Sequence, residues 1–138
     1  MSTHQVKADW IGGMAFDAHV GNHTVRIDNS IKGGGTDTGP MPKPFMLIAL
    51  AGCTGLDVIT MLDKMRVKYS DFNLEVTGTL SEDVPKVYTH IDIIYTIKVE
   101  DADKDKVEKA VNLSEEKYCG VSQMLKKAMT IGYTINYI

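Results

Sequence analysis

Residues 44–62 read PFMLIALAGCTGLDVITML and are apolar almost throughout. Pro44 suits the first turn of a helix, because the N–H that proline lacks would have no helical partner there. A helix that is apolar on nearly every side cannot lie on the surface of a small domain. The segment approaches the ~20 residues of a membrane-spanning helix, yet it contains Asp57 and two threonines. We therefore predict a core helix over Phe45–Leu62 that carries Cys53 into the interior.

Length and composition fit one globular domain, which we predict over residues 1–138, because 43% of the residues are hydrophobic and 24% are charged. The net charge of -3 provides no basic surface for phosphates, so we expect neither nucleic acid nor a membrane as a partner. The N-terminal residues lack a basic stretch followed by an apolar one, which predicts a cytoplasmic protein. In that compartment cysteines stay reduced unless oxidation is transient. The two cysteines are therefore expected to be reactive or buried thiols.

Alternating apolar residues predict strands on both sides of the helix. The expected strands are three within residues 4–28, an antiparallel pair at 73–81 and 87–99, and a last strand from residue 132. The expected further helices run from a cap at Asp101 or Asp103 to about Tyr118 and over 122–129. Strands and helices occur in separate blocks, which predicts the α+β class. The glycines at 33–35 lack the residues of a phosphate-binding loop and are predicted to form an ordinary loop.

Cys53 and Cys119 are the only obvious redox groups, and a thiol attacks only as the thiolate. A helix that restarts near Gly120 would place its positive end at Cys119 and favour the thiolate there. The apolar neighbours of Cys53, and Asp57 one turn further along the helix, do not favour a thiolate. A cation from elsewhere is needed, and the sequence does not choose among the candidates Lys43, Arg26 and Lys117.

A plainer interpretation of the cysteines remains open. Both thiols are explained equally well as small buried hydrophobic residues without chemistry. The four histidines and two cysteines show no recognised metal-ligand spacing, so we predict no metal site and no cofactor.

Five short segments carry a resemblance to a known family. They are Trp10–Met14, Gly-Pro-Met-Pro at 39–42, Ala51–Thr54, Thr89–Ile91 and Leu113–Cys119 with the residues up to Leu125 behind it. In these segments, and in the order and separation of its two cysteines, the chain resembles the OsmC/Ohr family, and in particular its YhfA-type branch. The OsmC/Ohr proteins are thiol-dependent peroxidases of bacteria, and the resemblance covers essentially the whole chain.

The resemblance implies an OsmC-like fold, in which antiparallel sheets wrap a long central apolar helix and two chains form an intertwined homodimer. It also implies that Cys53 is the peroxidatic cysteine and Cys119 the resolving cysteine, with an organic hydroperoxide as substrate and a dithiol as reductant. Characterised members pair the peroxidatic thiolate with an arginine that a glutamate orients. In this chain residues 41–45 contain no acid, and Met14 stands where such an arginine would be sought. Lys43 is the candidate substitute.

Two functions of different class follow from the sequence. The first is a two-cysteine peroxidase for organic hydroperoxides, with a role in oxidative stress. The alternative is a non-catalytic dimer on the same fold that binds an apolar small molecule in a methionine-lined pocket.

Overall fold

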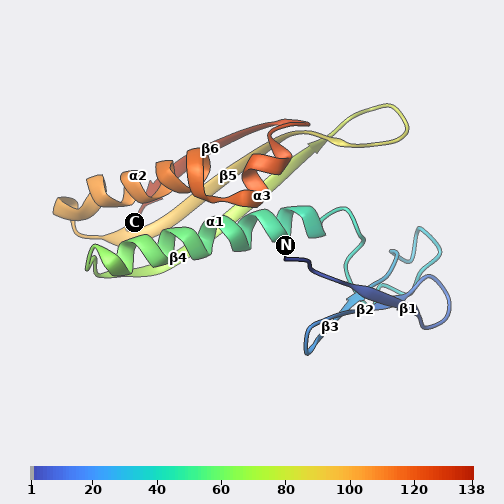
Figure 1. Ribbon diagram of the computed structural model, residues 1–138. Helices are drawn as coiled ribbons and strands as arrows, with labels where there is room; N and C mark the ends of the chain where they lie inside the picture. The colour runs from blue at the N-terminus through green and yellow to red at the C-terminus, as the bar shows by residue number, and fades with distance from the viewer. Residues whose placement is uncertain (1) are drawn as a thin grey trace. The chain divides into compact units, whose positions relative to one another are not determined.

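The computed structural model describes residues 2–138 and divides the chain into two compact units, Met1–Met46 and Leu47–Ile138. In chain order the elements are β1 (Lys7–Trp10), β2 (Phe16–Val20), β3 (His23–Ile27), α1 (Phe45–Lys64), β4 (Tyr69–Leu80), β5 (Tyr88–Val99), η1 (Asp101–Asp103), α2 (Lys104–Leu113), η2 (Ser114–Tyr118), α3 (Gly120–Leu125) and β6 (Thr130–Tyr137) (Figure 1). The predicted α+β class is confirmed. The prediction of one domain over residues 1–138 stays a prediction.

The N-terminal unit is a three-stranded antiparallel sheet in the order β1-β2-β3, as predicted for residues 4–28. Glycines with positive φ form the two turns, with Gly13 and Gly21 both at 56°. Asp17 on β2 faces Arg26 on β3 in the register, and the Arg26 guanidinium donates two hydrogen bonds to the Asp17 carboxylate. This pairing lowers the pKa of Asp17.

The glycine-rich loop after β3 is organised around the carboxylate of Asp28, which is 1% exposed. The carboxylate accepts hydrogen bonds from the amide and hydroxyl of Thr38 at 3.0 and 2.7 Å, the hydroxyl of Thr36 at 2.9 Å and the amide of Asn29 at 2.7 Å. A Cβ on Gly35 would lie 2.2 Å from the Asn29 backbone oxygen, so only glycine fits there. The loop therefore folds around the side chain of Asp28, and Gly35 allows its backbone to lie close to that of Asn29.

The C-terminal unit contains a second three-stranded sheet in the order β4-β5-β6. Strands β4 and β5 pair antiparallel, as predicted, but β6 pairs parallel to β5, so the expectation of purely antiparallel sheets is wrong for this pair. The chain passes through α2, η2 and α3 between β5 and β6. A helical crossover of this kind brings the next strand back in the same direction.

The core of the C-terminal unit lies between this sheet and the helices. Alternate residues of β5 point into it, and α1 and α2 contribute residues at helical spacing. The buried apolar side chains of these three elements are Ile91, Ile93, Tyr95, Ile97, Leu50, Val58, Leu62, Val107, Ala110 and Val111. The opposite face of α1 leaves Ile48 and Leu56 exposed at 54% and 68%. The sequence predicted a helix buried all round, whereas a single chain covers one face only.

Helix α1 is also long and apolar enough to span a membrane by length and composition alone, with a mean hydropathy of 2.0, and no other helix within residues 2–138 passes this test. The core residues that α1 contributes explain its apolar composition within a packed unit. The predicted cap of the following helix is right in position, because Asp103 stands at the N-cap of α2, but neither Asp101 nor Asp103 makes a side-chain capping bond. They pair instead with Lys104 and Lys106.

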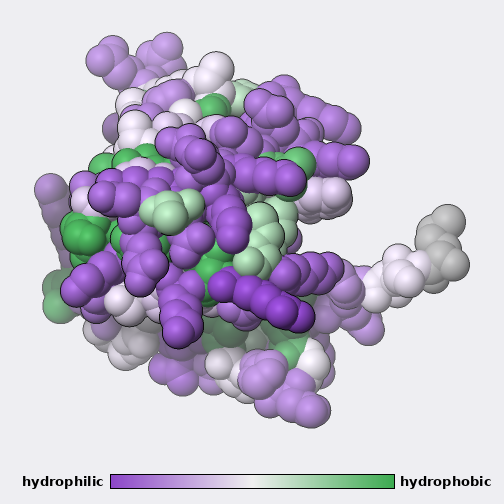
Figure 2. Space-filling model, turned by 90° about the vertical axis from the view of Figure 1, so that its left-hand side faces the viewer, coloured by the Kyte–Doolittle hydropathy of each residue, from purple (hydrophilic) through white to green (hydrophobic). Residues whose placement is uncertain are grey.

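Hydrophilic residues dominate the face shown in Figure 2, with hydrophobic residues visible between them.

Candidate active site

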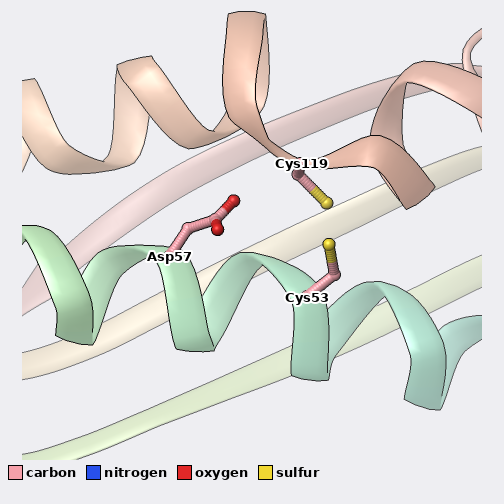
Figure 3. A group of neighbouring side chains, drawn as sticks. All are labelled: Cys53, Asp57 and Cys119. Carbon is pink, nitrogen blue, oxygen red and sulfur yellow. The ribbon is translucent and has the colours of Figure 1, made fainter.

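Two segments that are far apart in the sequence bring Cys53 and Cys119 together. Cys53 lies in the middle of α1, and Cys119 lies at the junction of η2 and α3, where its thiol points toward that of Cys53 (Figure 3). The two Sγ atoms and one carboxylate oxygen of Asp57 all lie within 4.8 Å of one another. Both cysteines are free thiols, with Cys53 half-buried and Cys119 fully buried. The structure therefore brings together the two cysteines to which the resemblance assigns roles.

Cys119 occupies the N-cap position of α3, where the Ser122 amide donates a hydrogen bond to its sulfur at 3.3 Å. Burial, together with the hydrogen bond that the Cys119 thiol donates to Cys53 and the nearby charge of Asp57, nevertheless raises the pKa of Cys119 to about 12. The Ser122 amide acts in the opposite direction and is outweighed. The expectation that the helix end makes Cys119 an acidic thiol is therefore wrong, because desolvation of a buried thiolate costs more than one amide returns.

Asp57 lies one turn after Cys53 on the same face of α1, as the sequence spacing predicts. Its carboxylate accepts a hydrogen bond from the Ser114 hydroxyl at 3.0 Å. Within residues 2–138 it forms no ion pair with a lysine, arginine or histidine. Asp57 also lines a cavity of about 490 Å³, whose other walls are Thr60, Met61, Lys64, Leu113 and Tyr118.

The buried acid Glu115 is linked to Cys119 through Ser122 and was not foreseen from the sequence. The Tyr95 hydroxyl donates to one of its oxygens at 2.5 Å and the Ser122 hydroxyl to the other at 3.4 Å. Burial raises the pKa of Glu115, although the bond from Tyr95 and the charge of Lys126 oppose the shift. Ser122 joins the two groups, because its hydroxyl binds Glu115 and its amide binds Cys119.

The local backbone explains why Glu115 points inward. The chain forms a turn of π-helix over Ser114–Tyr118, which rotates Glu115 into the core while Glu116 remains at the surface. The Lys126 ammonium and the Gln123 amide bind the backbone oxygen of Glu115 and hold this turn. Consecutive glutamates in a sequence indicate a solvated surface, so nothing in the sequence alone could have identified Glu115 as buried.

Two of the three candidate cations are engaged elsewhere. Arg26 pairs with Asp17 inside the N-terminal unit. The Lys117 ammonium lies over the Tyr118 ring, 5.3 Å from its centroid. This distance is within the ~6 Å of a cation–π contact. Lys43 belongs to the N-terminal unit, where it lines a surface cavity of about 440 Å³ with Met41, Pro42 and Met46. The need for a cation that favours the thiolate of Cys53 stays a prediction, and so does Lys43 as that cation.

The structure thus places two free thiols, one on a long core helix and one at a helix junction, within an α+β framework. The chain belongs to the OsmC-like family, whose model, described as OsmC-like protein, matches residues 34–134. It is 31% identical over 135 residues to Protein YhfA of Escherichia coli K12, a match that covers 97% of this chain and 98% of YhfA. The resemblance seen in the sequence, including its YhfA-type character, is confirmed.

Solved structures share the fold over the full length of the chain. A hypothetical protein from Aquifex aeolicus VF5 matches with a TM-score of 0.82 and 27% identity, covering 100% of this chain and 99% of that one. The organic hydroperoxide resistance protein OhrB of Bacillus subtilis matches with a TM-score of 0.65 and 20% identity, covering 98% of each chain. At that identity OhrB shows the fold alone, and the expected OsmC-like fold is confirmed.

Proposed function

We propose that this protein is a thiol-dependent peroxidase that reduces organic hydroperoxides, with Cys53 as the peroxidatic and Cys119 as the resolving cysteine. The observation that carries the proposal is the pair of free thiols with sulfur atoms within 4.8 Å, in a chain of the OsmC-like family. Cys53 is the more exposed of the two and therefore the one that a substrate reaches first. The name of the structural neighbour OhrB supports organic hydroperoxides as the substrate class.

The reaction balances with these two thiols and an external dithiol. The Cys53 thiolate attacks one peroxide oxygen, the O–O bond breaks, the alcohol leaves with a proton, and Cys53 becomes a sulfenic acid. The Cys119 sulfur then attacks the Cys53 sulfur, and the S–O bond breaks to release water and leave a disulfide. The dithiol reductant then reduces this disulfide by thiol–disulfide exchange. The reductant becomes a disulfide, and both cysteines return to thiols.

The surroundings of Cys119 suit a resolving thiol. Its raised pKa keeps it protonated until Cys53 has been oxidised. The Asp57 carboxyl group has an oxygen within 4.8 Å of the thiol and takes the proton in the second step, after a small approach. Because a disulfide is about 2.05 Å long, closing the pair requires a small approach of the junction between η2 and α3 toward α1.

The cavity beside Asp57 offers a place for the alkyl part of a hydroperoxide. Met61, Leu113 and Tyr118 form an apolar wall of this cavity, and Thr60 and Lys64 add polar groups to its lining. Apolar walls with a few polar groups are typical of small-molecule sites. The predicted preference for alkyl hydroperoxides over hydrogen peroxide follows from this lining.

We also propose that the protein works as a homodimer, in line with the apolar face of α1 that one chain leaves open. Ile48 and Leu56 are exposed on this face, and Gly52 has open space where a side chain would stand. Such a face is suited to pack against a second copy of the helix. Light scattering at micromolar concentration should show a dimer for the natural chain and a smaller species for Leu56→Glu. A stable monomer of the natural chain would contradict the dimer.

The alternative function is a non-catalytic dimer that binds an apolar small molecule. The observation in its favour is Cys119 itself, whose pKa of about 12 makes it inert at neutral pH unless Cys53 has already been oxidised. In this alternative the cavity beside Asp57 holds the ligand and the cysteines only pack.

A sulfenic acid trap separates the two functions. Cys119→Ser treated with cumene hydroperoxide should give a dimedone adduct at Cys53, since the resolving step is blocked, whereas Cys53→Ser should give none. The double variant serves as the matched control for adducts elsewhere in the chain. An adduct only in Cys53→Ser would exchange the two roles, and no adduct in either single variant would favour the binding function.

A further inference from the structure

Cys53, Asp57 and Cys119 together form a donor set of two sulfurs and one carboxylate oxygen (Figure 3). Zinc is bound in proteins by thiolates at about 2.3 Å and carboxylate oxygens at about 2.0–2.2 Å, in tetrahedral geometry. Neighbouring ligand atoms around such an ion lie roughly 3.3–3.8 Å apart. The three atoms here all lie within 4.8 Å of one another, so an approach of about 1 Å gives this geometry.

We propose that Cys53, Asp57 and Cys119 form a binding site for Zn²⁺, with water as the fourth ligand. The site goes beyond the proposed peroxidase and does not depend on it, because the same three side chains can bind an ion whether or not the protein turns over a hydroperoxide. Thiolate ligands favour zinc over magnesium and calcium, which prefer oxygen ligands alone.

The neighbours of the three side chains are arranged as supports for metal ligands. The Ser114 hydroxyl donates to one oxygen of Asp57, which orients the carboxylate and leaves the other oxygen to bind. The Ser122 amide donates to the Cys119 sulfur, which stabilises negative charge on it. Two thiolates and a carboxylate would repel one another in this half-buried place, and a doubly charged cation removes most of that repulsion.

The sequence spacing could not predict this site. Cys53 and Asp57 are one turn apart on α1, but the third ligand comes from the junction of η2 and α3, far along the chain. The cavity of about 490 Å³ beside Asp57 provides the route for the ion and room for its water ligand.

Binding has a chemical consequence for both thiols. Each must lose its proton to bind the ion, so the affinity should rise with pH. The bound ion also occupies the electron pair with which Cys53 would attack a peroxide, so zinc and hydroperoxide should compete for the site.

Cobalt is a spectroscopic probe for this site. Titration of the fully reduced protein with Co²⁺ should give thiolate-to-cobalt absorption that saturates at one ion per chain, and added Zn²⁺ should abolish it. Cys53→Ser and Cys119→Ser should weaken zinc binding by at least ~100-fold, more than the loss of an outer hydrogen-bond partner costs, and Asp57→Asn by at least ~10-fold. Asp63→Asn, on the exposed side of the same helix, should bind as the natural chain does.

Failure of the zinc site is distinguishable from failure of the peroxidase, because the absorption is read without any peroxide. Absence of the thiolate-to-cobalt absorption in the reduced natural chain would overturn the proposal, as would unchanged affinity in Asp57→Asn. Far-UV circular dichroism identifies a variant that does not fold. In that case the natural chain decides: zinc, but not magnesium, should slow alkylation of Cys53 by iodoacetamide, and an equal rate with and without zinc would overturn the site.

Discussion

Asp28 in the N-terminal unit and Glu115 in the C-terminal unit are both carboxyl groups that are 1% exposed, yet their pKa values move in opposite directions. Asp28 accepts four hydrogen bonds, two of them from backbone amides, which hold its pKa well below its usual range. Glu115 accepts hydroxyl bonds from Tyr95 and Ser122 only, and burial raises its pKa. The number and kind of donors, rather than burial alone, decides whether a buried acid is charged.

The two acids also differ in their surroundings, since Asp28 organises a loop and Glu115 is linked to the site of the two cysteines. Asp28 gathers the glycine-rich loop around a charge that accepts four hydrogen bonds from it. Glu115 and Asp57 flank Cys119, where a carboxyl group with few donors, a protonated thiol and a second thiol meet. Incompletely satisfied acids beside a nucleophile are typical of functional sites.

The largest effect is expected at Asp28. Asp28→Ala leaves the hydroxyls of Thr36 and Thr38 and two backbone amides without their acceptor. The amides of Asn29 and Thr38 should then exchange with deuterium at least ~10-fold faster, the factor that one lost hydrogen bond produces. Asp37→Asn, in the same loop and exposed, should leave these rates unchanged. Equal rates in Asp28→Ala would show that the loop does not depend on this acid.

The next effect concerns acid stability of the N-terminal unit. The folded pKa of Asp28 lies below its ordinary value of 3.8, so its stabilising contribution is complete above pH 3.8 and is lost as the pH falls toward the folded pKa. The fluorescence of Trp10, the only tryptophan, reports unfolding of this unit. Urea titrations should show stability that falls with acid in the natural chain and a flatter profile in Asp28→Asn. Parallel profiles would contradict the lowered pKa.

Glu115 should give the opposite sign. Its folded pKa lies above the ordinary value of 4.5, so the folded state holds its proton more tightly and the free energy of unfolding falls as the pH rises from 4.5 through the folded pKa. The slope for one group is at most about 1.4 kcal/mol per pH unit. Glu115→Gln keeps an acceptor for Tyr95 and should remove this slope in urea titrations followed by circular dichroism. A slope that persists in Glu115→Gln would place its origin at another group.

The smallest effect is expected from the single bond that supports Asp57. Ser114→Ala removes one hydrogen bond to the carboxylate and should lower the free energy of unfolding by about 1 kcal/mol. Ser70→Ala removes an exposed bond to Asp71 and is the control, with an expected change near zero. A loss of unfolding free energy larger than that in Asp28→Ala would contradict the expected order of effects in the two units.

Much of the fold was predictable because it depends on local periodicity. The alternation in 87–99 identified the face of β5 that carries Ile91, Ile93 and Tyr95, and the apolar run at 44–62 identified α1. The parallel pairing of β6 was missed, since it depends on the path of the chain through α2 and α3 rather than on any pattern within the strand.

The site was predictable in its residues and not in its surroundings. The resemblance to a known family identified Cys53 and Cys119, and helical spacing placed Asp57 on the face of Cys53. The burial of Glu115 depends on one turn of π-helix, and the bond from Ser122 depends on where α3 begins. Both are tertiary features, and so is the burial of Cys119, which reversed the expectation that Cys119 would be an acidic thiol.

The central claim is that Cys53 and Cys119 act as one redox pair, and its most direct test is the product of a single oxidation. The reduced protein is treated with one equivalent of cumene hydroperoxide, its free thiols are counted, and its peptides are mapped by mass spectrometry. The account predicts that both thiols disappear together, that the mass of the chain falls by two hydrogens, and that the peptide containing Cys53 is joined to the one containing Cys119. Loss of only one thiol, or of neither, would contradict it.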